Sequence, residues 1–141
     1  MLSANTAIIE KSEKGMYHFP ADMSVRSTGS YTERREMAVI RFVQKLGIRP
    51  HLNGYHLLIR AITLALESPE LLKSLTKELY PQVARDYGKD VKAVERNMRK
   101  AIESAYEYDP ERIQSVFYYK VDKPYISEVL SIAVESIRYE L

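Results

Sequence analysis

The sequence predicts an all-α fold, a bundle of about six helices that contains a helix-turn-helix. Apolar residues recur at helical spacing from near Tyr31 to the last residues, and no convincing strand follows residue 31. A turn glycine, Gly88, separates a short helical pattern from a longer one. With 141 residues, of which 45% are hydrophobic and 28% are charged, the chain has the size of one globular domain with a tail.

Residues 1–31 differ from the rest and are predicted to form an N-terminal arm. This stretch is rich in Ser, Thr and Gly and has no long period. A turn signal at residues 12–15 lies between two short apolar segments, so the arm is expected either to form a small hairpin or to be irregular and flexible. Residues 32–141 then form the helical domain.

Caps and breaks predict the first helices of that domain. The first helix starts near Tyr31 and ends at Gly47; Ser30 has capping-box spacing to Glu33, and Thr32 is a competing N-cap. Asn53 is the predicted N-cap of the second helix. Pro69 ends the second helix and opens a third helical segment, because proline is tolerated only in the first turn of a helix.

The second half contains the predicted helix-turn-helix. A short helix stops at Gly88, and Asp90 is the N-cap of a longer helix over about residues 91–106. Asp109 and the proline after it open another short helix. A final helix is predicted over about residues 125–140, because apolar residues form one stripe along it.

The composition excludes several kinds of protein. The chain has no cysteine, which rules out disulfides, thiolate nucleophiles and cysteine-ligated zinc or iron–sulfur sites. No stretch approaches 18 consecutive apolar residues and the first residues do not resemble a signal peptide, so we expect a cytoplasmic protein without a membrane span. His51 and His56 are five residues apart, and no phosphate loop is present. We therefore expect no metal, no cofactor and no enzyme activity.

Positive charge is concentrated in the longer helix of the helix-turn-helix. Residues 89–100 contain five basic and two acidic residues, whereas the whole chain has a net charge of only +2. At 100° per residue the basic side chains lie opposite the apolar ones. This face is either a nucleic-acid surface or an ordinary solvated face on which Arg96 and Arg99 pair with Glu95 or Glu103.

The side chains of this face suit base reading. Arg96 and Arg99 are neighbours, and each can donate two hydrogen bonds to guanine O6 and N7. Glu95, at the edge of the face, can accept from cytosine N4. Lys92 and Lys100 are better placed to contact phosphates.

Four segments carry a resemblance to a known family. They read LGIRPHLNGY at 46–55, LLKSLTKELYP at 71–81, VERNMRKAIE at 94–103 and KPYISE at 123–128. In this order and spacing they make residues 32–140 similar to the DNA-binding effector domain of the stage 0 sporulation protein A family. The resemblance implies a six-helix transcriptional regulator with its recognition helix, about residues 91–106, in the major groove of double-stranded DNA.

The resemblance also implies which residues bind and what they bind. Its base-reading residues carry over to Glu95, Arg96 and Arg99, and its target is a box close to TGNCGAA, often in tandem copies that a homodimer occupies. RNA polymerase is a further candidate partner. The phosphate-contacting candidates are Lys89, Lys92 and Lys100. The family uses its last helix in protomer contacts, for which the candidates are Ile132, which lies off the predicted buried stripe, and Ser136.

Three departures from the family pattern bear on function, and one of them, Tyr125 and Ile126 in place of a polar pair, concerns the dimer geometry. The family has an N-terminal receiver domain, for which the first 32 residues leave no room, so we expect a stand-alone effector or a fragment. The turn at residues 89–93 also differs from the family's Thr- and Ser-rich version. An alternative function is a protein-interaction module that pairs with or antagonises a full-length response regulator.

Overall fold

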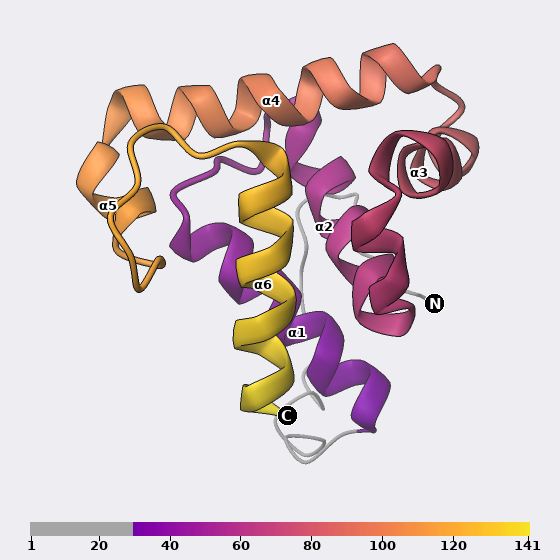
Figure 1. Cartoon of the computed structure of the whole chain (residues 1–141), viewed down its shortest axis with the longest axis horizontal. Helices are drawn as coiled ribbons and strands as arrows, with labels where there is room; N and C mark the ends of the chain where they lie inside the picture. The colour runs from indigo at the N-terminus through magenta and orange to yellow at the C-terminus, as the bar shows by residue number, and fades with distance from the viewer. Residues whose placement is uncertain (1–29) are drawn as a thin grey trace. The chain divides into compact units, whose positions relative to one another are not determined.

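The computed structural model describes residues 30–141, and the predicted N-terminal hairpin or arm lies outside the described residues. Residues 32–141 form one compact body (Figure 1). Within the described part there are six α-helices and no strand, so the prediction of an all-α fold is confirmed. The α-helices are α1 (Tyr31–Lys45), α2 (Asn53–Glu67), α3 (Tyr80–Tyr87), α4 (Val91–Tyr108), α5 (Pro110–Gln114) and α6 (Ile126–Glu140).

Two short helical segments join α2 to α3. The 3₁₀ segment η2 (Pro69–Lys73) follows the break that Pro69 introduces. The π-helical segment η3 (Leu75–Leu79) then runs directly into α3. Pro81 lies in the first turn of α3, where its missing N–H has no intrahelical partner to lose. The chain therefore passes from η3 into α3 without a break at this proline.

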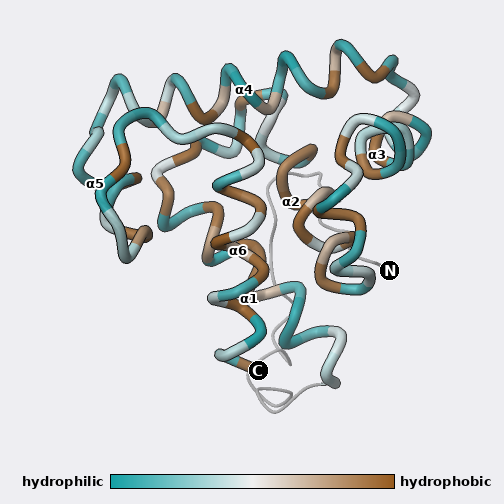
Figure 2. The backbone as a smooth tube through the Cα atoms, in the orientation of Figure 1, coloured by the Kyte–Doolittle hydropathy of each residue, from teal (hydrophilic) through white to brown (hydrophobic). Residues whose placement is uncertain are grey.

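The central helix of the domain is α2. It contacts α3, α4, α6 and both short segments, and more than half of its residues are buried. In Figure 2 the tube of α2 is mostly brown, whereas α4 alternates between teal and brown along its length. This is the pattern expected when α2 is enclosed and α4 has one buried and one exposed face. None of the helices in residues 30–141 combines the length and apolar character needed to span a bilayer.

Helix starts follow the predicted caps at some positions and not at others. The Asp90 carboxylate accepts a hydrogen bond from the N–H of Ala93 at 2.7 Å, and Asp109 caps α5 in the same way. The prediction that Asn53 caps α2 is wrong. Leu52 is the N-cap, with extended backbone, and its carbonyl accepts from the N–H of Tyr55, so Asn53 is already the first helical residue.

The C-terminal end of α1 is fixed by a side chain from far along the sequence. Arg112 in α5 donates to the carbonyl oxygens of Gln44 at 2.7 Å and Lys45 at 3.2 Å. These carbonyls belong to the last turn of α1, which has no intrahelical donors for them. A guanidinium at this helix end also interacts favourably with the helix dipole. Arg112 therefore ties α5 to α1.

Replacing Arg112 with alanine is expected to lower the free energy of unfolding by about 1 kcal/mol, because two charge-assisted but solvent-accessible hydrogen bonds are lost. Urea denaturation followed by circular dichroism measures this change. Arg138→Ala, which removes an exposed arginine from α6, is the matched control and should stay within about 0.5 kcal/mol of wild type. Equal stability of the two variants would contradict the role of Arg112.

Candidate nucleic-acid interface

The turn between α3 and α4 has the geometry of a helix-turn-helix. Gly88 has φ 63°, ψ 37°, the left-handed conformation that glycine adopts without strain, and it ends α3. The N–H of Lys89 donates to the carbonyl of Ala84 at 3.0 Å and closes the turn. Asp90 then caps α4, so only two residues separate the left-handed turn residue from the next helix. The predicted turn and cap are both confirmed.

The two faces of α4 differ sharply in chemistry. Its buried residues are Val94, Met98, Ala101, Ile102 and Ala105. Lys92, Arg96, Arg99 and Lys100 are exposed, and Glu95 is half-buried at the edge of the exposed face. The helix continues to Tyr108, two residues beyond the predicted end. The helices that contact α4, which are α2, α3, α5 and α6, lie on one side of it (Figure 1). Its basic residues are exposed, so they face away from this packing.

A glycine sets the distance between α4 and the body of the domain. Gly54, in the first turn of α2, is buried against α4. A Cβ atom at Gly54 would overlap the backbone oxygen of Asn97 and lie 2.7 Å from the Cβ of Ala101. The backbones of α2 and α4 therefore approach each other more closely than any side chain at residue 54 permits. This role of Gly54 could not be predicted from the sequence, in which the only signal was a glycine inside a helical pattern.

Two of the three predicted base-reading residues pair with each other. The Arg99 guanidinium donates to the Glu95 carboxylate at 2.7 Å, and both side chains are a little under half exposed. The hydrogen bond that Arg99 donates to this carboxylate raises the pKa of the arginine. The predicted pairing on the helix surface is thus observed. It is an exposed i,i+4 ion pair that water or another anion can replace at little cost.

Arg96 and the lysines complete the basic face. Arg96 is exposed on the side of α4 opposite its buried stripe. The predicted phosphate contacts are also exposed, with Lys89 in the turn, Lys92 in the first turn of α4 and Lys100 one turn beyond Arg96. All these cations follow the turn within twelve residues of the chain, and the only carboxylates among residues 89–100 are those of Asp90, used as a cap, and Glu95. The face is therefore suited to a polyanion.

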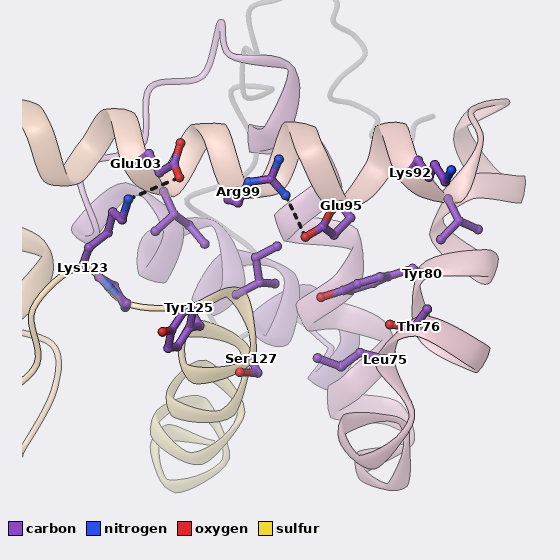
Figure 3. A pocket seen from close by; sticks show the side chains of 14 residues that line it. Leu75, Thr76, Tyr80, Lys92, Glu95, Arg99, Glu103, Lys123, Tyr125 and Ser127 are labelled. Atoms are coloured by element: carbon purple, nitrogen blue, oxygen red, sulfur yellow. Dashed lines mark hydrogen bonds and ion pairs between the residues drawn. The ribbon is translucent and has the colours of Figure 1, made fainter.

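A pocket with a volume of about 570 Å³ lies beside this face (Figure 3). Its lining includes Glu95 and Arg99 from α4, Tyr80 from α3 and Tyr125 from the start of α6. Burial, together with the negative charge of Glu95, raises the pKa of Tyr80 to about 12, so its hydroxyl stays neutral. This pocket could not be predicted from the sequence, because its walls come from segments far apart in the chain.

The two predicted protomer-contact residues differ in exposure. Ser136 is exposed on α6. Ile132 is only 6% exposed, so the prediction that it lies off the buried stripe is wrong. The reason is that α6 packs against α2, α4 and η2 together, which buries a wider arc of the helix than the single stripe that was predicted.

The histidines show no metal site in the described residues. No group of three or more potential metal-ligating side chains is found among residues 30–141. Burial lowers the pKa of His56, whose backbone carbonyl accepts from the Tyr87 hydroxyl at 3.4 Å. Tyr87 is 42% exposed, although its spacing to Val83 and Ala84 would place it on the apolar stripe of α3. His18 lies outside the described residues.

The fold and the basic face together define a helix-turn-helix domain of the DNA-binding class. A comparison with protein families agrees with this class. Residues 39–137 match the model of the family described as "Sporulation initiation factor Spo0A C terminal", and the chain belongs to this family. This family is a DNA-binding effector domain of transcriptional regulators in sporulation, and the resemblance expected from the sequence is confirmed.

Proposed function

We propose that this chain regulates transcription by binding a specific sequence in double-stranded DNA, with α4 in the major groove. The observation that carries the proposal is the exposed basic face of α4, which is held away from the core by the packing of its apolar side. A helix that projects in this way is the element that helix-turn-helix proteins insert into the major groove. The family membership supports DNA as the ligand.

The contacts divide into base reading and phosphate binding. Glu95, Arg96 and Arg99 read base edges, because bidentate arginines recognise guanine and a carboxylate recognises the cytosine amino group. The phosphate contacts are Lys89, Lys92 and Lys100, which flank the reading residues. When Arg99 turns toward a guanine, Glu95 is released from the ion pair and becomes available to a cytosine.

The resemblance supports a finer proposal about the target and the assembly. The target is a box close to TGNCGAA, and tandem boxes are occupied by a homodimer through contacts of α6 that include Ser136. With Ile132 buried, the exposed side chains of α6 must supply the apolar part of such a contact. RNA polymerase is the proposed partner of the DNA-bound protein.

A binding titration tests the proposal directly. Fluorescence anisotropy with a duplex that contains the TGNCGAA box and with a scrambled duplex, at one stated salt concentration, should show affinities that differ by about 1,000-fold or more. Equal, weak binding to both duplexes would contradict sequence-specific recognition. In that case, co-purification with a full-length response regulator would test the alternative function, a module that pairs with such a regulator.

A further inference from the structure

The pocket beside α4 combines an apolar floor with a rim of hydrogen-bond donors. Ile102 and Ile126 are buried at its floor. Its rim carries the hydroxyl groups of Thr76, Tyr125 and Ser127, all three on exposed residues. Figure 3 shows that these hydroxyl-bearing residues come from both walls, η3 on one side and the start of α6 on the other. Neutral hydroxyl donors on two facing walls are suited to phosphate oxygens.

The charged residues of the pocket add to this chemistry. Three cations, Lys92, Arg99 and Lys123, line it together with the two carboxylates of Glu95 and Glu103. Each carboxylate is already paired, Glu95 with Arg99 at 2.7 Å and Glu103 with Lys123 at 3.4 Å. The net charge of the lining is therefore positive, and an incoming anion can replace either carboxylate as the partner of a cation.

Lys123 reaches this pocket from outside the helix-turn-helix. It belongs to the segment between α5 and α6, and its ammonium lies beside Glu103 of α4 (Figure 3). The next residue, Pro124, is buried, which fixes the backbone that carries Lys123. The side chain of Lys123 remains about half exposed. A cation distant in sequence is thus held next to the proposed base-reading residues.

We infer that this pocket receives one sugar–phosphate strand of the bound DNA, with Lys123 as a phosphate contact outside the helix-turn-helix. The inference rests on the proposed function. When a helix lies in the major groove, the two strands pass along its two flanks, and this pocket lies along the flank that carries Glu95 and Arg99. Continuity with the basic face of α4 and exposed donors favour a strand over a small enclosed ligand.

The inference assigns opposite effects to the two members of one ion pair. Lys123→Ala removes one phosphate contact, so binding should weaken about fivefold at about 0.15 M salt, by the same factor for the box and for the scrambled duplex. The slope of log K against log salt should become shallower by about 0.9. Glu103→Gln removes the competing carboxylate and should tighten binding to both duplexes. If the ion pair between Lys123 and Glu103 only held the segment between α5 and α6 against α4, both variants would weaken DNA binding.

The matched control is Lys120→Ala, which removes an exposed lysine from the same connecting segment but outside the pocket. This control should leave the salt slope unchanged. Equal slopes for Lys123→Ala, Lys120→Ala and wild type would overturn the inference, as would a loss of affinity confined to the box. In either case, the proposed function stands if the wild-type protein binds the box more tightly than the scrambled duplex. If the wild-type protein binds both duplexes equally, the proposed function itself is contradicted.

Discussion

Replacing Gly54 with alanine is expected to destabilise the whole domain, by about 3 kcal/mol in the free energy of unfolding. The new Cβ atom would overlap the backbone oxygen of Asn97 and lie 2.7 Å from the Cβ of Ala101. The oxygen of Asn97 is part of the α4 backbone and cannot rotate away as a side chain can. Relief therefore requires α4 to move as a whole, which places this overpacking at the upper end of its usual cost.

Helix propensity alone predicts the opposite sign for this substitution. Alanine is favoured over glycine inside a helix by up to about 1 kcal/mol. The sign of the change in the free energy of unfolding therefore shows which effect is larger, the helix propensity of residue 54 or the contact of α2 with α4. Urea denaturation followed by circular dichroism gives the value, and a more stable Gly54→Ala variant would contradict the observed packing.

Two variants sharpen this test. Gly88→Ala is the matched control, because no atom lies within 4 Å of its Cβ position and only the left-handed backbone, at φ 63°, opposes it. It should cost about 1 kcal/mol. Adding Ala101→Gly to Gly54→Ala removes one of the two clashes but leaves the backbone oxygen of Asn97 in place. Rescue should therefore be partial, and full rescue would show that the backbone contact is unimportant.

The start of α4 illustrates what local sequence determines. Gly88 and Asp90 act within four residues of their own positions, through a left-handed turn and a side-chain cap. Such short-range chemistry can be predicted from the sequence, and both features are confirmed. The exposed and buried faces of α4 follow in the same way, because a helix with a strong apolar stripe has only one side that can pack.

Features that depend on several partners could not be predicted in this way. Ile132 is buried because α6 is enclosed by three elements, and the sequence of α6 does not show how many neighbours it has. Asn53 favours caps in general, but the extended backbone of Leu52 places the helix start one residue earlier. The pocket and Lys123 depend on where the chain returns after α5. The burial of Ile132 and the position of Lys123 are thus set by tertiary packing.

The ion pair between Glu95 and Arg99 belongs to a surface that can both pair internally and bind DNA. The spacing of four residues permits a surface salt bridge, and the structure contains it. The same side chains project from a helix that the fold holds outward. An exposed pair is weak enough to exchange partners, so its presence in the free protein is compatible with base reading. Only a measurement on DNA separates the two roles.

Loss of Arg96 and Arg99 is expected to abolish the preference for the TGNCGAA box. Each bidentate arginine–guanine contact discriminates by about tenfold to hundredfold, so the double alanine variant should lose about 100-fold or more in affinity for the box. Affinity for a scrambled duplex should fall much less, since only the general attraction of two positive charges is removed. Anisotropy titrations of both duplexes at one salt concentration measure the two effects separately.

Lysine substitutions distinguish base reading from charge. Arg96→Lys and Arg99→Lys keep the positive charge but lose the planar fork that donates two parallel hydrogen bonds. The double lysine variant should therefore bind the scrambled duplex as wild type does, with an unchanged salt slope, and lose the preference for the box. Arg85→Ala, which removes an exposed arginine from α3, should keep that preference. If the double lysine variant still discriminates as well as wild type, Arg96 and Arg99 are surface charges, and the bases are read elsewhere.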